Sequence, residues 1–102
     1  MLDLFHGFIW DAGNKSKCQK HGVSIEEIEE LFNGDALHIE PDLQNSVAEE
    51  RFNAIGMTAK GRYIFLVFAI RNHEIESLIR PISARFMHKK EIAHYAQKNS
   101  DV

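Results

Sequence analysis

The residues best suited to chemistry lie in the segment 78–85. Arg80 and Arg85 are five residues apart and flank Ser83, a residue type that favours the N-terminal cap of a helix. The pattern predicts a strand that ends just before Ser83 and a helix that begins there. A cation in the first helical turn is unfavourable beside the positive end of the helix dipole, unless an anion binds there. Arg85 and Lys89 would share one face of this helix, so the cluster suits a phosphate group.

A second interpretation of the same arginines is structural. Surface arginines often form ion pairs, and the chain offers carboxylates that could pair with Arg80 and Arg85, namely Glu50, Glu74 and Glu91. Clustered charges mark functional sites only as a trend. The sequence alone leaves the phosphate-binding and ion-pairing interpretations open.

The six histidines invite a metal-binding hypothesis, which the spacing does not support. Glu91 and His94 have the E-x-x-H spacing of di-iron helices, but such a site needs two of these helices and two more glutamates. The motifs of serine hydrolases, P-loop enzymes and dinucleotide-binding proteins are also missing. We therefore expect neither a metal nor a cofactor.

The composition predicts one globular domain over residues 1–102, with the net charge of -3 distributed unevenly. Residues 60–102 hold eight of the twelve basic and four of the fifteen acidic side chains, so a basic surface is possible in an acidic protein. The longest apolar run, residues 63–70, is too short to span a membrane. The single cysteine and the lack of an export signal favour the cytoplasm.

The first half of the chain predicts a strand and two helices. Residues 5–10 form an apolar strand, and Asp11 caps a short basic helix that Gly22 ends. Ser24 and Glu27 form a capping box for a second helix, which ends at residues 33–35.

The second half predicts mainly strands. Residues 36–40 form a strand and residues 41–50 a loop, after which three strands follow one another as a meander before the C-terminal helix from Ser83. These strands cover residues 51–57, 62–70 and about 75–82, with a turn at residues 58–61 that uses Gly61, a second turn at residues 71–74, and a frayed tail at residues 99–102. The predicted fold is α+β, with an antiparallel sheet packed with two N-terminal helices and one C-terminal helix.

Short motifs along most of the chain resemble the BrnT family of small RNA-cleaving toxins. In the N-terminal half the matching residues are Phe8-Ile9-Trp10-Asp11, Asn14, Lys20-His21-Gly22-Val23-Ser24, Glu26-Glu27 and Leu31-Phe32. In the C-terminal half they are Glu50-Arg51-Phe52, Ile55-Gly56, Gly61-Arg62, Arg80-Pro81-Ile82-Ser83-Ala84-Arg85, Lys89-Lys90-Glu91 and Tyr95. Their order over residues 5–96 is more specific than any single piece.

The resemblance implies a RelE-like α+β fold and a toxin of a type II toxin-antitoxin system. It also implies a metal-independent endoribonuclease that inhibits translation and growth. The implied partners are RNA, a BrnA-like antitoxin encoded next to the toxin, and operator DNA, which would be contacted only through the antitoxin complex. The matching positions that inherit a possible role are Trp10, His21, Glu50, Arg62, Arg80 and Arg85.

Metal-free RNA cleavage needs a base for the 2′-hydroxyl, a cation for the phosphorane and an acid for the leaving 5′-oxygen. Arginine suits the second task because its planar fork binds two phosphoryl oxygens. We assign that task to Arg80 and Arg85 with Arg62 in support. The general base is His21 or Glu50, with His88 as a third candidate. Expected RNA-binding residues are Trp10, which also fits a core position, Lys20 and Lys89.

A different class of function is also compatible with the sequence. A small α+β adaptor could bind RNA or a protein partner through the basic C-terminal face without cutting RNA. RNA cleavage in the presence of a chelator would separate the two hypotheses.

Overall fold

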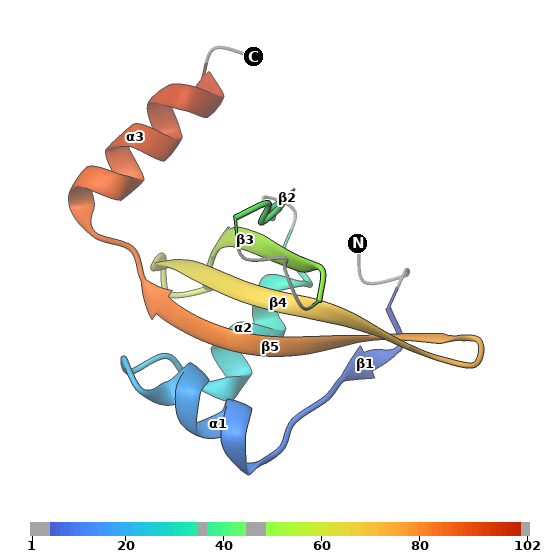
Figure 1. Ribbon diagram of the computed structural model, residues 1–102. Coiled ribbons are helices and arrows are strands. Elements are labelled where there is room, and N and C mark those ends of the chain that lie inside the picture. The colour runs from blue at the N-terminus through green and yellow to red at the C-terminus, as the bar shows by residue number, and fades with distance from the viewer. Residues whose placement is uncertain (1–4, 35–36, 45–48, 101–102) are drawn as a thin grey trace.

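The computed structural model describes the backbone of residues 5–34, 37–44 and 49–100, and it shows five strands and three helices (Figure 1). The predicted α+β class is confirmed. The strands form one sheet in the order β1-β5-β4-β3-β2. The elements are β1 (Gly7–Phe8), α1 (Ala12–Gln19), α2 (Ile25–Leu31), β2 (His38–Pro41), β3 (Arg51–Met57), β4 (Tyr63–His73), β5 (Glu76–Phe86) and α3 (Lys89–Ser100).

The sheet is mixed, which corrects the expectation of an antiparallel sheet. β2, β3, β4 and β5 pair antiparallel in turn, but β1 pairs parallel to β5, with Gly7 opposite Leu78 and Phe8 opposite Ile79. A parallel pair needs a long crossover connection. Here the whole chain from α1 to β4 supplies that connection.

The two N-terminal helices begin where their capping residues predict. Asp11 accepts a hydrogen bond from the Asn14 backbone N–H at 3.0 Å, and Ser24 Oγ accepts one from Glu27 N–H at 3.1 Å. Both helices cover the same face of the sheet (Figure 1). Their buried side chains are Asn14 and Cys18 in α1 and Ile28 and Leu31 in α2. Cys18 is thus a small filler of the core, as its place in the predicted helix suggests.

An aromatic cluster centred on Phe32 joins the helices to the sheet. Phe32 follows α2, is fully buried, and makes edge-to-face contacts with Phe5, Phe8 and Phe68 at centroid distances of 5.4–6.4 Å. Phe52 stacks on Phe68 at 5.5 Å. Such pairs add about 0.5–1.5 kcal/mol each beyond the area that they bury. The cluster joins the end of α2 to β1, β4 and β3.

The C-terminal half differs from its prediction in one important place. The predicted helix from Ser83 is wrong, because β5 continues to Phe86 and pairs Ser83 with Val67 and Arg85 with Phe65. Ending β5 at residue 82 would leave the first residues of β4 without backbone partners on that side, and unpaired buried backbone groups are costly. This long-range pairing overrides the local capping signal of Ser83.

The turns of the strand region are displaced only slightly. Gly61 adopts a φ of 82° in the turn between β3 and β4, as predicted. The second turn lies at Glu74 and Ile75, at the end of the predicted range 71–74 and one residue past it, and Glu74 has a φ of 56°. The strand expected from residue 36 begins at His38, while residues 35–36 lie outside the described part of the chain.

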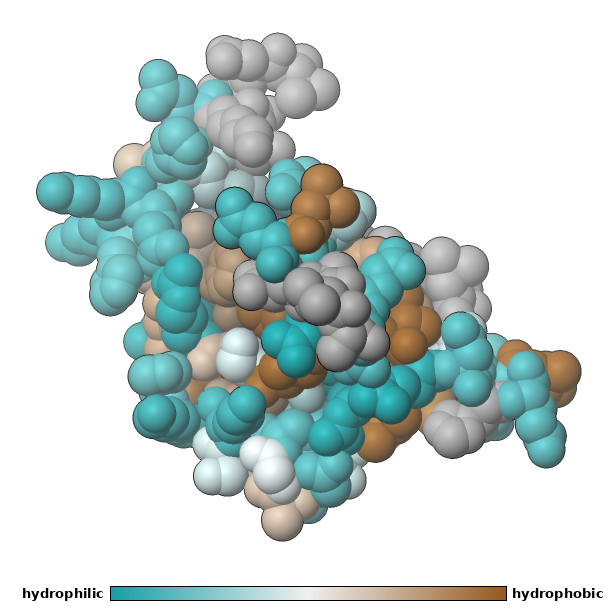
Figure 2. Space-filling view, in the orientation of Figure 1, coloured by the Kyte–Doolittle hydropathy of each residue, from teal (hydrophilic) through white to brown (hydrophobic). Residues whose placement is uncertain are grey.

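α3 begins at Lys89, and its start is fixed by Glu91, which accepts a hydrogen bond from the His88 backbone N–H at 3.0 Å. The helix leaves the end of β5 and extends away from the sheet, and its visible surface is mostly hydrophilic (Figures 1 and 2). Tyr95 lies 6.0 Å from His38 and 6.1 Å from Tyr63 between ring centroids, which joins α3 to the sheet. The expectation of a frayed tail at residues 99–102 is wrong for residues 99–100, which belong to α3, and residues 101–102 lie outside the described part of the chain.

We predict that Asn14→Ala lowers the free energy of unfolding by about 2 kcal/mol or more. The buried Asn14 amide donates to the carbonyl oxygens of Ile9 at 2.8 Å and Pro81 at 2.9 Å. Its loss leaves both oxygens unpaired, at about 1–3 kcal/mol for each buried group. Urea denaturation measures the change. The exposed Asn33 is the control, and Asn33→Ala should change stability by about 0.5 kcal/mol or less; equal losses in the two variants would contradict the role of Asn14.

Candidate active site

A basic cavity of about 360 Å³ lies where β5 meets α1. Four cationic side chains line it, namely Lys17, Arg51, Arg71 and Arg80. Glu49 is the carboxylate in its lining, and the remaining lining residues are Gly13, Asn14, Pro81 and Ile82. We call this space the basic cavity.

The strand register gathers the cavity arginines. Arg51 on β3 and Arg80 on β5 both lie opposite Ala69 on β4, so the two arginines flank a side chain that is only a methyl group. Arg71, two residues beyond Ala69 on β4, points to the same face. The small residue in the middle of the row leaves room above the sheet between three guanidinium groups.

An irregularity in β5 determines which face Arg85 occupies. Arg80 and Arg85 are five residues apart, an odd number that would place them on opposite faces of a regular strand. Their partners on β4, Ala69 and Phe65, are four residues apart, because the register shifts between Val67 and Phe68. The extra residue in β5 is a bulge that brings both arginines to one face, about 13 Å apart along the sheet.

Pro81 lies at this bulge and helps to explain why the strand is irregular there. Proline has no backbone N–H to donate, so it is tolerated in a sheet at bulges and edges. Its carbonyl oxygen accepts the hydrogen bond from Asn14 described above. Pro81 therefore stands at a point where the strand is irregular and anchored to α1.

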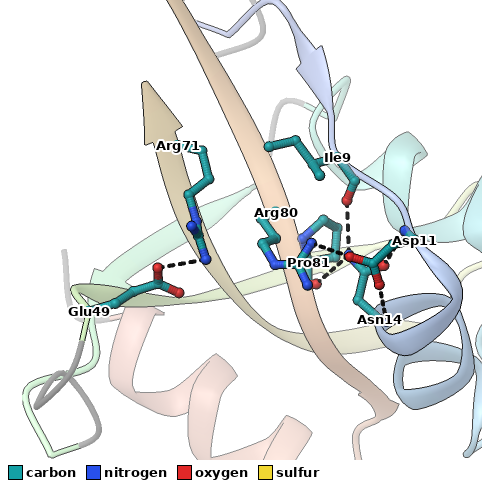
Figure 3. Close-up of polar contacts among 7 residues, drawn as sticks. All are labelled: Ile9, Asp11, Asn14, Glu49, Arg71, Arg80 and Pro81. Atoms are coloured by element: carbon teal, nitrogen blue, oxygen red, sulfur yellow. Dashed lines mark hydrogen bonds and ion pairs between the residues drawn. The ribbon is translucent and has the colours of Figure 1, made fainter. Parts of the chain in front are cut away.

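Asp11 holds Arg80 at the edge of the cavity (Figure 3). Asp11 Oδ2 accepts a hydrogen bond from Arg80 Nη1 at 2.8 Å, while the other carboxylate oxygen caps α1. The Asn14 backbone N–H, followed by the Arg80 guanidinium, holds the pKa of Asp11 below its usual value. The Arg80 side chain is 26% exposed, so it is braced by a charged partner and still reachable from solvent.

The lining of the cavity is mainly positive, and two of its arginines form ion pairs. Arg71 pairs with Glu49 at 2.8 Å, and Arg80 pairs with Asp11. Among the residues that line the cavity, four are cations and one, Glu49, is a carboxylate. Such an arrangement can bind one phosphodiester group by charge and by guanidinium hydrogen bonds.

Arg85 has a different environment from Arg80. Its Nη1 and Nη2 atoms donate to the two carboxylate oxygens of Glu91 at 2.7 Å each, and its guanidinium lies 4.9 Å from the Phe65 ring centroid. The hydrogen bond to Glu91 raises the pKa of Arg85 against the effect of burial. Arg85 lines a second hollow of about 130 Å³ together with His21, Phe65, Val67, Ser83 and Ala84.

The other predicted site residues are dispersed. Arg62 is exposed with its guanidinium 3.5 Å from the Phe86 ring centroid, and Glu50 is exposed between Glu49 and Arg51. Trp10 packs against the core and donates from Nε1 to Glu29 at 2.9 Å. Three further candidates are exposed at helix ends, namely Lys20, His88 and Lys89. The structure therefore brings Arg80 to the basic cavity and places Arg85 and His21 in the second hollow.

Sequence reasoning missed Lys17, Arg51 and Arg71 as cavity residues. A signal for two of them was present, because Arg51 begins and Arg71 follows the two strands of the predicted hairpin. Antiparallel pairing brings such ends together. Lys17 had no comparable signal, since the packing of α1 beside β5 depends on distant residues.

Within the described ranges 5–34, 37–44 and 49–100, no group of three or more His, Cys, Asp or Glu side chains is arranged to hold a metal ion. The helices of this part of the chain also include none that is long and apolar enough to cross a membrane.

The family model for the ribonuclease toxin BrnT of type II toxin-antitoxin systems matches residues 10–91. The chain belongs to the BrnT family. The match contains every residue that lines the basic cavity and the second hollow. It confirms the family that the motifs resemble, and it identifies the chain as a toxin with an RNA substrate and an antitoxin partner. No curated protein matches the sequence.

We predict that Arg85→Ala raises the pKa of Glu91 from about 2 towards its usual 4.5, because the hydrogen bond from Arg85 is the main cause of the lowered pKa. In the wild type, the ion pair contributes stability above pH 4.5 that is lost as the pH falls towards 2. A carboxyl ¹³C NMR titration measures the pKa of Glu91, and urea denaturation at several pH values measures the change in stability. Arg62→Ala is the matched control and should leave the titration of Glu91 unchanged; a pKa that stays near 2 in Arg85→Ala would contradict the assignment.

Proposed function

We propose that this BrnT-family chain is an endoribonuclease that works without a metal ion and that the basic cavity is its reaction centre. The observation that carries the proposal is the position of Arg80, which is braced by Asp11 and accompanied in one cavity by Arg51, Arg71 and Lys17. The arginines lie on hydrogen-bonded strands, which favours a preorganised site. A RelE-like relationship of the fold belongs to the same proposal.

The cavity suits the charge that develops during RNA cleavage. The 2′-oxygen loses its proton and attacks phosphorus, the bond to the 5′-oxygen breaks, and that oxygen takes up a proton. The products are a 2′,3′-cyclic phosphate and a 5′-hydroxyl. The negative charge on the pentacoordinate phosphorus group is what Arg80 stabilises through its two-pronged guanidinium, with Arg51 and Arg71 beside it.

Of the two general-base candidates, Glu50 is favoured over His21. Glu50 stands between Glu49 and Arg51 in the chain, and both of these neighbours line the basic cavity. His21 lines the second hollow with Arg85. A base has to reach the 2′-hydroxyl directly or through one water molecule, so the position of Glu50 between two lining residues of the basic cavity is the stronger argument.

The remaining basic residues extend the RNA-binding surface in this proposal. Lys20 lies exposed just after α1, Lys89 lies exposed at the start of α3, and Arg62 lies exposed just before β4. Exposed cations of this kind bind phosphates without sequence preference and make the affinity dependent on salt. Removal of these cations should weaken RNA binding more than it lowers the rate at which bound RNA is cleaved.

The partners and the compartment follow from the same proposal. We place the protein in the cytoplasm, with a BrnA-like antitoxin encoded next to it and operator DNA bound through the complex of the two. An inhibitor that acts directly on the reaction centre has to cover the basic cavity. We therefore expect the antitoxin to present carboxylates to Arg51, Arg71 and Arg80, since opposite charges across an interface favour association.

We predict that Arg80→Ala slows RNA cleavage at least ~100-fold when the assay contains a chelator, since removing one preorganised donor typically costs this much. Stability should fall by about 1 kcal/mol or less, because the lost pair with Asp11 is partly exposed. Single-turnover cleavage and thermal melting of the same preparations measure the two quantities.

The matched control for Arg80→Ala is Lys90→Ala, which removes an exposed cation of α3 and should cleave at the wild-type rate. Arg80→Lys keeps the charge but loses the two-pronged geometry, so it should fall between wild type and Arg80→Ala. A folded Arg80→Ala protein that cleaves like wild type would end the assignment of Arg80. Tight RNA binding by wild type without any cleavage would favour the adaptor hypothesis.

A further prediction concerns growth. Production of this chain alone in bacteria should stop growth, and co-production of the neighbouring small protein should restore it, because the antitoxin blocks the cavity. Colony counts after induction measure the effect, with Arg80→Ala as the control that leaves growth intact. Normal growth with the wild-type protein present at full length would contradict the toxic activity of this copy.

A further inference from the structure

The second hollow combines apolar walls with unused hydrogen-bonding groups. Phe65, Val67 and Ala84 supply apolar surface, and the His21 ring and the Ser83 hydroxyl lie in the same lining. Neither His21 nor Ser83 forms a side-chain hydrogen bond with another residue of the described part of the chain. A volume of about 130 Å³ is below the roughly 300–1,000 Å³ of pockets that bury a drug-sized ligand. The hollow therefore suits one planar ring with polar edges.

The guanidinium of Arg85 is unsuited to a second phosphate and suited to stacking. Both carboxylate oxygens of Glu91 already occupy its two terminal nitrogens, which balances its charge and fixes the plane of the group. One of its flat sides lies near the Phe65 ring. A fixed guanidinium plane and an aromatic ring are the surfaces on which proteins stack RNA bases.

The bulge in β5 relates this hollow to the basic cavity. Arg80 and Arg85 lie on one face of the sheet about 13 Å apart, on either side of the irregular segment at Ile82. α1 borders both spaces, since Gly13 and Lys17 line the basic cavity and His21, just after the helix, lines the second hollow. A short stretch of RNA can therefore contact both spaces along the same edge of the sheet.

We propose that the second hollow is a nucleobase subsite, in which Arg85 stacks on a base and Ser83 and His21 form hydrogen bonds with its edge. The proposal rests on the proposed ribonuclease function, and it assigns the base preference of cleavage to the hollow and the phosphate chemistry to the basic cavity. Arg85 thereby becomes a specificity-determining residue. The ligand class is a single base of an unpaired RNA strand, next to the phosphate that Arg80 binds.

The test uses the full chain and small probes that separate the two spaces. Adenosine, guanosine, cytidine and uridine are each titrated into ¹⁵N-labelled protein, and ribose 5-phosphate serves as the phosphate probe without a base. At least one nucleoside should shift the amide signals of His21, Ser83 and Ala84 in a saturable manner. Ribose 5-phosphate should shift signals of the basic cavity and leave those of the hollow unchanged.

Three variants test the roles within the hollow. Ser83→Ala and His21→Ala should each weaken binding of the preferred nucleoside about fivefold or more, through the loss of one hydrogen bond to the base. Arg85→Lys keeps a cation for Glu91 but loses the planar surface, and it should weaken binding about fivefold or more through lost stacking. Lys90→Ala on α3 is the matched control and should bind as wild type does.

Cleavage of RNA oligonucleotides that differ in one base completes the experiment. Ser83→Ala should reduce the preference among these substrates while cleavage continues, whereas Arg80→Ala should abolish cleavage of all of them. RNA cleavage by wild type without saturable nucleoside shifts at His21, Ser83 or Ala84 would overturn the base subsite and leave the ribonuclease function standing. Nucleoside binding at the hollow without RNA cleavage would overturn the proposed function and keep the subsite.

Discussion

The site depends on the pairing of β4 with β5, and in particular on the register shift between Val67 and Phe68. Without the extra residue in β5, Arg80 and Arg85 would lie on opposite faces of the sheet. Asn14 contributes from the other side, because its buried amide bonds to Pro81 and Ile9 and so ties α1 and the strand edge together. The bulge and this amide together place the basic cavity and the second hollow along one edge. An irregularity of this kind is typical of strands beside functional sites.

Arg80 and Arg85 show how different ion pairs determine whether an arginine can still bind an anion. Asp11 uses one oxygen to hold Arg80 and the other to cap α1, so part of the Arg80 guanidinium remains able to bind an anion. Glu91 uses both oxygens on Arg85 and also accepts the His88 backbone N–H, which joins β5 to α3. The Arg85 guanidinium is thus held in a fixed plane by Glu91. The Arg80 guanidinium is held by Asp11 in a cavity that three other cationic side chains line. Both arginines form ion pairs, Arg85 with the predicted Glu91 and Arg80 with Asp11, which was not predicted as its partner. The pair with Asp11 leaves Arg80 able to bind a phosphate, whereas the two bonds to Glu91 leave Arg85 unsuited to one.

The sequence was sufficient for the features that depend on neighbouring residues. The helix cap at Asp11, the capping box at Ser24, the turn at Gly61 and the α+β class are all local or periodic patterns, and the structure confirms them. The helix expected at Ser83 failed because a capping residue competes with strand pairing to β4, and that pairing is not visible in the local sequence. For the same reason, Arg85 was expected in the first turn of a helix, whereas it lies in β5. Lys17 remained unrecognised because only the packing of α1 on β5 brings it to the cavity.

The central claim is that Arg80, in a cavity shared with Arg51 and Arg71, binds the phosphate at which RNA is cut. The most direct test is NMR of the arginine Nε–Hε groups during titration with a 2′-O-methyl trinucleotide, which keeps the phosphates but lacks the attacking hydroxyl. The account predicts saturable shifts of Arg80, Arg51 and Arg71 that are larger than any shift of Arg62, which lies outside the basic cavity beside Phe86. Saturable binding that shifts Arg62 and leaves Arg80 as it is in the free protein would contradict it.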